Sequence, residues 1–113
     1  MDKKDIVILK KILEEIRYLD NLVKTMSVYE EFDAEEKTKR ATAMTLINIG
    51  ELANHLSKEF QKSQTDFPIR GAVDLRNVAA HGYHILRFKD IWHTVQTSIP
   101  DLKVKIEKLL KHL

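Results

Sequence analysis

The chain of 113 residues contains no cysteine, only three glycines and only two prolines. The absence of cysteine excludes disulfides and thiolate metal sites, and it is compatible with a reducing compartment. Alternating apolar and polar runs, which are typical of strands, are absent. No apolar run approaches the roughly 18 residues of a membrane span, and the charged start lacks the apolar stretch of a signal peptide. We therefore expect a soluble, cytoplasmic protein with no membrane partner.

An excess of charge of one sign is also missing. The chain has 19 basic and 17 acidic residues, and its formal net charge is +2. This balance neither requires nor excludes a nucleic-acid partner. If RNA is bound, the basic groups must be gathered locally or shared across an oligomer. The length and the 43% hydrophobic content predict one globular domain over residues 1–113 with a thin core.

Most of the chain consists of long segments in which apolar residues recur with helical periodicity. The first helix is predicted over residues 2–28, and its apolar stripe consists of Leu9, Ile12, Leu13, Ile16, Leu19, Val23 and Met26. After a short connection over residues 29–32, Asp33 is the predicted N-cap of a second helix over residues 33–60, with Glu36 completing a capping box. Its predicted core positions are Ala41, Met44, Leu46, Ile49, Leu52, Leu56 and Phe60. Gly50 in this helix indicates close approach of a neighbouring helix.

The second half of the chain predicts two further helices. A polar loop over residues 61–66 precedes a short third helix over residues 68–80, which Pro68 starts and Gly82 terminates. A fourth helix begins near Phe88, and Pro100 should kink or restart it. Its apolar positions are Ile91, Trp92, Val95, Leu102, Ile106, Leu109 and Leu110. The predicted fold is all-α, a four-helix up-down bundle with two long antiparallel helices and a short third helix.

Polar groups suited to handling phosphate are concentrated at the end of the third helix. Arg76 is a permanent cation whose forked donors match phosphate oxygens. His81 carries an imidazole, the side chain that most often takes or gives a proton in catalysis. Asn77 lies one helical turn before His81 and is expected to orient the imidazole or to bind substrate. Such a set of residues is suited to acid–base cleavage of a phosphodiester, with attack by the ribose 2′-hydroxyl.

Three segments carry a resemblance to a known family. Arg76-Asn77-x3-His81-Gly82-Tyr83 resembles the Arg-x4-His-x-Tyr signature of the HEPN superfamily, specifically its HepT toxin branch. Arg40-Ala41, followed by residues 46–52 (LINIGEL), is similar to the pattern of that branch's second helix. Residues 91–102 resemble its last helix. The branch often has a tryptophan after the proline where this chain has Ile69, and larger residues where it has Ala79 and Ala80.

This resemblance implies a specific function. Members of the branch are homodimers that cleave RNA without a metal, and the arginine and histidine of both protomers meet at the dimer interface. Their partner is a cognate minimal nucleotidyltransferase antitoxin, which neutralises the toxin by AMPylation of the signature tyrosine. By position, Arg76 and His81 would be catalytic here and Tyr83 would be the modified residue. The implied system is a type VII toxin–antitoxin pair without a cofactor.

Other residues have supporting or ordinary roles in this interpretation. Glu51 lies in the stretch that resembles the family and is expected to hold Arg76, while Arg40 is expected to face the active-site groove. Lys37 and Lys39 are expected on a solvated face. His55 is expected to be exposed, and Arg70 and Asp74 are expected to pair with each other. Trp92 is expected to pack in the core or at a dimer contact. We expect no metal site among His81, His84 and His93.

Two alternatives belong to other functional classes. The chain could be a non-catalytic helical partner that binds a nucleotidyltransferase. It could also be an RNA- or nucleotide-binding adaptor, in which Arg76 binds phosphate and His81 only forms hydrogen bonds. Replacement of His81 by alanine discriminates among them, because only an enzyme would lose cleavage while it kept binding.

Overall fold

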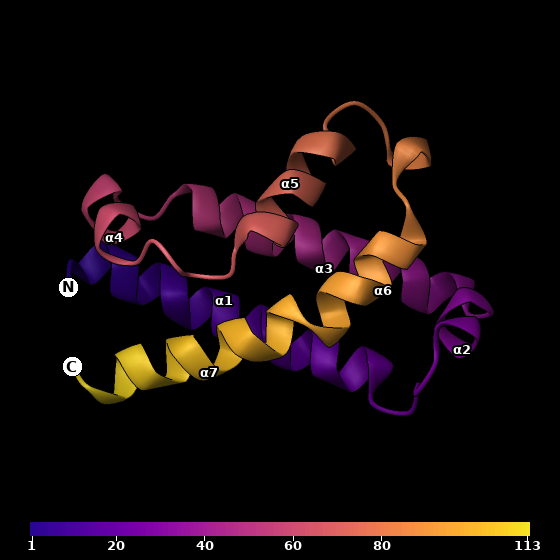
Figure 1. Ribbon diagram of the computed structural model, residues 1–113, viewed down its shortest axis with the longest axis horizontal. Helices are drawn as coiled ribbons and strands as arrows, with labels where there is room; N and C mark the ends of the chain where they lie inside the picture. Colours follow the sequence, from indigo (N-terminus) through magenta and orange to yellow (C-terminus); the bar gives the residue numbers. More distant parts are fainter.

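The computed structural model describes residues 1–113 and contains seven α-helices and one 3₁₀-helix. The elements in chain order are α1 (Lys3–Val23), α2 (Tyr29–Asp33), α3 (Glu36–Asn54), α4 (Lys58–Ser63), α5 (Arg70–Ala79), η1 (Tyr83–Ile85), α6 (Phe88–Gln96) and α7 (Ser98–Lys111). In Figure 1, α1 and α3 are long and antiparallel, α7 lies along α1, and α5 crosses α3. The all-α bundle predicted from periodicity is therefore confirmed. None of these helices combines the length and the apolar character that a bilayer span would need.

The core lies between α1, α3 and the α6–α7 pair. Every member of the stripe predicted for the first helix is buried except Met26, which is partly buried. Ile12 and Ile106 are fully buried, and burial of each such side chain stabilises the fold by roughly 1.5–3 kcal/mol. The 3.6-residue period of these positions is sufficient to specify the face that α1 buries.

The junction between the first two long helices differs from the prediction. α1 ends at Val23 rather than Val28, and residues 29–33 form the short helix α2 instead of an irregular connection. The Glu31 carboxylate accepts hydrogen bonds from the Ser27 N–H at 2.9 Å and the Val28 N–H at 3.3 Å. These bonds satisfy N–H groups at the start of a helix and so favour a new helix here.

The predicted N-cap role of Asp33 is wrong. Asp33 is the last residue of α2, and α3 begins at Glu36 with Glu35 in the N-cap position and no side-chain cap. The Asp33 carboxylate instead accepts a hydrogen bond from the Lys39 ammonium at 2.9 Å. The Asp33 carboxylate therefore forms an ion pair with Lys39 in place of the predicted N-cap hydrogen bond to a backbone N–H.

The second long helix is also shorter than predicted, since α3 ends at Asn54 rather than Phe60. Ser57 caps α4, because its hydroxyl accepts from the Phe60 N–H at 3.1 Å. The buried Asp5 of α1 accepts from the Ser57 N–H at 2.8 Å and from the Ser57 hydroxyl at 2.6 Å. A cap supported from α1 therefore separates α3 from α4.

One predicted core position is wrong, because Met44 is 57% exposed. The buried positions of α3 include Thr42 and Thr45. Thr45 satisfies its hydroxyl locally, by donating to the Ala41 carbonyl oxygen at 2.7 Å. The buried face of α3 is therefore rotated from the predicted stripe, toward residues that a hydrophobicity pattern scores as polar.

The break near Pro100 is present but lies three residues earlier. α6 ends at Gln96, α7 begins at Ser98, and Thr97 joins them. Pro100 is in the first turn of α7, where its missing N–H would have had no helical partner. Gly82 follows the end of α5 as predicted, and its φ of +136° lies in a region that residues with a Cβ rarely adopt.

Candidate active site

The site is built on a close contact between α5 and α3. A Cβ placed on Gly50 would collide with the Ala72 carbonyl oxygen and would lie 2.9 Å from the Arg76 Cβ. The close helix approach expected from Gly50 is therefore present. Only glycine lets α5 lie this near to α3, and the contact sets Arg76 directly above the next residue of α3, Glu51.

Arg76 is held by two side-chain contacts. Its Nε donates to the Glu51 carboxylate in an ion pair between α5 and α3. One terminal nitrogen donates to the Asn77 amide oxygen at 3.1 Å. The Arg76 side chain is 37% exposed, so the guanidinium is fixed at its inner edge and remains accessible at its outer edge.

His81 lies outside the regular helix. α5 ends at Ala79, and the backbone N–H of His81 donates to the Val78 carbonyl oxygen in the turn that follows. The His81 side chain is exposed and makes no hydrogen bond in the structure. Asn77 was expected to orient this imidazole or to bind substrate. Its amide oxygen accepts from Arg76 rather than from His81, and binding of substrate by Asn77 stays a prediction. The imidazole is thus free to meet a substrate or another protein chain.

Tyr83 and Arg40 form a second group at the other end of the loop. The Arg40 guanidinium carbon lies 5.4 Å from the centre of the Tyr83 ring, in the range of a cation–π contact. The same ring packs edge-on against Phe88 of α6 at 6.0 Å between centroids. Burial raises the pKa of the Tyr83 hydroxyl above its ordinary value, and the positive charge of Arg40 opposes that change.

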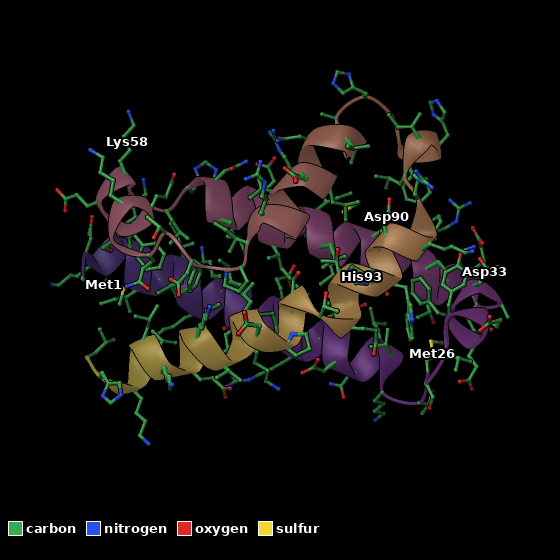
Figure 2. The ribbon with its side chains drawn as sticks, viewed as in Figure 1. Met1, Met26, Asp33, Lys58, Asp90 and His93 are labelled. Atoms are coloured by element: carbon green, nitrogen blue, oxygen red, sulfur yellow. The ribbon has the colours of Figure 1, made fainter.

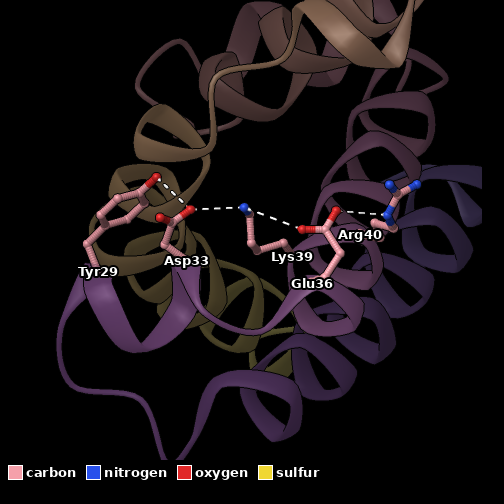
Figure 3. Close-up of polar contacts among 5 residues, drawn as sticks. All are labelled: Tyr29, Asp33, Glu36, Lys39 and Arg40. Carbon is pink, nitrogen blue, oxygen red and sulfur yellow. Dashed lines mark hydrogen bonds and ion pairs between the residues drawn. The ribbon is translucent and has the colours of Figure 1, made fainter.

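Arg40 also belongs to a network of polar and charged groups with Tyr29, Asp33, Glu36 and Lys39 (Figure 3). Lys39 was expected on a solvated face, and that expectation is wrong, because its side chain is only 13% exposed. Its ammonium lies 2.9 Å from Asp33, 3.6 Å from Glu36 and 4.6 Å from the centre of the Phe88 ring. Glu36 also pairs with Arg40 at 3.0 Å. The network joins α2 to α3, and the contact between Lys39 and Phe88 extends it to α6.

These contacts shift the pKa values of the network. The hydrogen bond from Lys39 holds the pKa of the Asp33 carboxyl below its ordinary value, and the same bond raises the pKa of Lys39. Burial, followed by the charge of Asp33, raises the pKa of Tyr29, whose hydroxyl donates to Asp33 at 3.3 Å. No sequence rule would have found this network, since Asp33 and Lys39 are six residues apart and lie on different helices.

The structure therefore places the expected site residues in two groups. Glu51, Arg76 and Asn77 meet at the α3–α5 contact, and Arg40 meets Tyr83. Arg40 and Glu51 are eleven positions apart on α3, or about 16 Å at 1.5 Å per residue. His81 lies in the chain segment that connects the groups and is bonded to neither.

The remaining residues singled out in the sequence are peripheral. Arg70 and Asp74 pair at 3.8 Å, as predicted, and both side chains are exposed. His55 is exposed, also as predicted, and it lies directly after the end of α3. His81, His84 and His93 do not gather with other side chains into a set of three possible metal ligands.

Comparison with known proteins gives consistent matches over most of the chain. A family model described as “Ribonuclease HepT-like” matches residues 12–109. The chain is 30% identical to the “Probable ribonuclease HepT” of Thermococcus cleftensis over 91% of this chain and 93% of that protein. It is also 30% identical to a protein of Caldanaerobacter subterraneus subsp. tengcongensis that carries the name “Putative RNase”, over 91% of each chain. No solved structure matches the chain significantly.

Proposed function

The chain belongs to the HepT-like ribonuclease family of the HEPN superfamily, and from this premise we propose that it is the cytoplasmic toxin of a type VII toxin–antitoxin system. Its activity would be metal-independent endoribonucleolytic cleavage. The observation that supports this most is the anchored Arg76 at the end of α5, followed within five residues by an exposed and unpaired His81. A fixed cation and a free imidazole on one short segment are suited to a phosphodiester substrate.

The contacts of Arg76 leave it able to bind phosphate. A guanidinium has five N–H donors, and Glu51 and Asn77 use one each, which leaves three. Both contacts fix the orientation of the fork, so a phosphate meets donors that are already aligned. Such preorganised donors stabilise the charge that develops on the non-bridging oxygens as the reaction proceeds.

In the proposed mechanism, the imidazole of His81 removes the proton from a ribose 2′-hydroxyl. The 2′ oxygen attacks the adjacent phosphorus and the bond to the 5′ oxygen breaks. The His81 of a second subunit, or water, protonates the leaving oxygen. The products are a 2′,3′-cyclic phosphate and a free 5′-hydroxyl. A general base of this kind contributes about 10²- to 10⁴-fold to the rate.

This mechanism is the reason to propose a homodimer. Each chain carries one suitable histidine, while the reaction needs both a base and an acid. The His81 side chain is exposed and has no partner within its own chain. Two chains that meet at the α5–η1 loop would place two imidazoles and two guanidinium groups around one phosphodiester.

The substrate requirement tests the proposal. An RNA oligonucleotide and its all-DNA analogue are incubated with the protein, with and without a metal chelator, and the products are analysed by mass. We expect cleavage of RNA alone, products that end in a 2′,3′-cyclic phosphate, and no effect of the chelator. Cleavage of the DNA analogue at a similar rate would contradict the mechanism.

Regulation by a cognate minimal nucleotidyltransferase antitoxin forms the second part of the proposal. In this reaction the Tyr83 oxygen attacks the α-phosphorus of ATP and pyrophosphate leaves. The Tyr83 side chain is 37% exposed and therefore accessible. The attached AMP adds bulk and negative charge beside Arg40, where we expect the RNA to bind, and both effects oppose RNA binding.

The AMPylation proposal has its own test. The protein is incubated with the antitoxin and ATP, and the modified peptide is mapped by mass spectrometry. We expect one AMP on Tyr83 and loss of cleavage. A Tyr83→Phe variant should take no AMP, whereas Tyr18→Phe, the matched control, should still be modified, because Tyr18 is also exposed but lies on α1. Modification at another residue, with Tyr83 unchanged, would refute this part of the proposal.

A non-catalytic RNA-binding adaptor is the competing function, and replacement of His81 separates it from the enzyme. In an adaptor, the anchored Arg76 would bind phosphate and the His81→Ala variant would be as toxic to cells as the original chain. Both functions need an accessible imidazole, and the His81 side chain is exposed, so the cleavage and toxicity of this variant decide between them.

A further inference from the structure

A cavity of about 400 Å³ opens between α2 and α6. It lies at the end of the molecule opposite α4 (Figure 1). Its lining includes none of the candidate active-site residues Glu51, Arg76, His81 and Tyr83. The residues that line it are Tyr29, Glu30, Lys89, Trp92, His93 and Gln96. Its volume falls in the range of roughly 300–1,000 Å³ that is typical of small-molecule sites.

Two aromatic rings form the floor of this cavity and are held from behind. Trp92 and Tyr29 both pack on the fully buried Phe32, with centroid distances of 5.1 Å and 6.3 Å. Both rings are half-buried, so each is fixed on its inner side and open on its outer side. Rigid aromatic rings that face an open cavity are suited to stacking on a flat ligand.

Polar side chains surround the rings, and the two charged ones form no ion pair. Lys89 lies over the Tyr29 ring at 5.7 Å, and neither Lys89 nor Glu30 belongs to any of the ion pairs of the structure. His93 projects from α6 in the same half of the molecule as Asp33, away from Met1 and Lys58 (Figure 2). The rim therefore offers a free ammonium, an imidazole, a carboxylate and the amide of Gln96.

We propose that this cavity binds one nucleotide unit. The base stacks on Trp92, and the phosphate is bound by His93 and by Lys89, which lies over the Tyr29 ring. The Glu30 carboxylate accepts a hydrogen bond from an exocyclic amine of the base, as acidic side chains do with the amine of cytosine. Cytidine is therefore favoured over uridine, which has the same size and carries a carbonyl oxygen at that position.

The unit has two possible sources with the same chemistry, namely a free mononucleotide or one residue of an RNA chain. Binding of the mononucleotide is independent of the proposed ribonuclease function. Binding of one residue of an RNA chain rests on the proposed ribonuclease function. The cavity would then be a second contact with the RNA substrate, at a distance from the cleaved bond.

Trp92 is the single tryptophan of the chain, so its fluorescence reports directly on this cavity. The unsubstituted protein is titrated with CMP, UMP and inorganic phosphate. We expect saturable quenching by CMP, weaker binding of UMP and no saturable change with phosphate. Equal responses to CMP and UMP, or quenching that rises linearly without saturation, would overturn the proposal.

Variants assign the effect to the cavity. Lys89→Ala and Tyr29→Leu should weaken CMP binding on the order of 10- to 100-fold. The exposed position of Lys89 makes Lys89→Ala informative even if Tyr29→Leu fails to fold. Lys62→Ala is the matched control, because Lys62 is on α4 at the far end of the molecule. The same loss in Lys62→Ala and Lys89→Ala would refute the site.

The two sources are separated in the His81→Ala protein, which leaves RNA intact if the proposed mechanism holds. A cytidine-containing oligoribonucleotide that quenches Trp92 at lower concentration than CMP, with Lys89→Ala weakening both, identifies an RNA subsite. Quenching by CMP alone identifies a free-nucleotide site. Absence of quenching by either ligand overturns this inference, while cleavage of RNA by the unsubstituted chain is measured separately and reports on the proposed function.

Discussion

The Arg76 guanidinium donates to the Glu51 carboxylate across the α3–α5 contact that Gly50 permits. Gly50 and Glu51 are consecutive, so the residue that brings α5 close to α3 is followed by the residue that anchors its arginine. The same two positions therefore control both the packing of α5 and the orientation of the proposed phosphate ligand.

The first prediction concerns Gly50. Gly50→Ala should destabilise the protein by about 1–3 kcal/mol, although alanine is the better helix former by about 1 kcal/mol. The added Cβ meets the Ala72 backbone and the Arg76 Cβ, and neither can move without a shift of α5. Chemical denaturation measures the change in free energy of unfolding.

Gly71→Ala is the control for this prediction. A Cβ at Gly71 would lie 3.3 Å from the terminal methyl of Thr94, a tight contact that small adjustments of a side chain can relieve. Its stability should stay within about 1 kcal/mol of the original chain, because the gain in helix propensity offsets the contact. Equal losses in the two variants would show that the α3–α5 approach is not the cause.

The second prediction concerns Glu51. Glu51→Ala should lower kcat for RNA cleavage about 10- to 100-fold. Without the ion pair to Glu51, the Arg76 guanidinium is no longer held in position, and a misplacement of about 1 Å in a reacting group can lower the rate by this factor. Glu51→Gln should retain more activity than Glu51→Ala, since an amide oxygen still accepts from the arginine Nε. His55→Ala serves as the control, because His55 is exposed and lies four residues after Glu51, just beyond the end of α3. An Ala variant at Glu51 with full activity would remove the positioning role.

The third prediction is a pH dependence of stability. The Asp33 pKa is lowered by its hydrogen bond from Lys39, so the ionised form stabilises the fold. This contribution is present above the ordinary carboxyl value of 3.8 and is lost as the pH falls through the lowered pKa. Asp33→Asn should therefore lower Tm near pH 7 and have little effect near about pH 2.

Asp74→Asn provides the comparison for Asp33. Asp74 pairs with Arg70 at 3.8 Å and both side chains are highly exposed, so its loss should change Tm little at any pH. A constant difference in Tm between Asp33→Asn and the original chain, from neutral to acid pH, would contradict the assignment of the ion pair.

The fourth prediction concerns Gly82. A side chain at this position would be strained by the φ of +136° and would meet the His84 ring, whose Cε1 lies 2.7 Å from the ideal Cβ position. Gly82→Ala should cost about 1–3 kcal/mol if the loop keeps its shape. Because His81 and Tyr83 flank this glycine, we expect cleavage to fall more than stability does. Ala80→Gly in the same turn is the control and should affect cleavage less.

Much of the fold was predictable from the sequence because the apolar period of residues 8–23 and 99–110 specifies the buried faces. The position of Gly50 also predicted the close approach of α5. The helix boundaries were less predictable, because they depend on side chains from other elements. Asp5 of α1 bonds to Ser57 and separates α3 from α4, and no local pattern contains that contact.

The candidate site was predictable where one short segment carries its residues. Arg76, Asn77, His81 and Tyr83 are close in sequence, and Glu51 was expected to reach Arg76. The Lys39 network was not predictable, since a lysine followed by an arginine on a charged helix is ordinarily solvated. Burial of Lys39 follows from α2 and Phe88, which the sequence pattern placed in a connection and in a separate helix.

The measurement that tests the central claim most directly is the rate of RNA cleavage by His81→Ala, with His112→Ala as the control at the exposed end of the chain. The account predicts a loss of about 10²- to 10⁴-fold in His81→Ala, unchanged RNA binding, and full activity in His112→Ala. Cleavage by His81→Ala at the rate of the original chain would contradict the proposed chemistry.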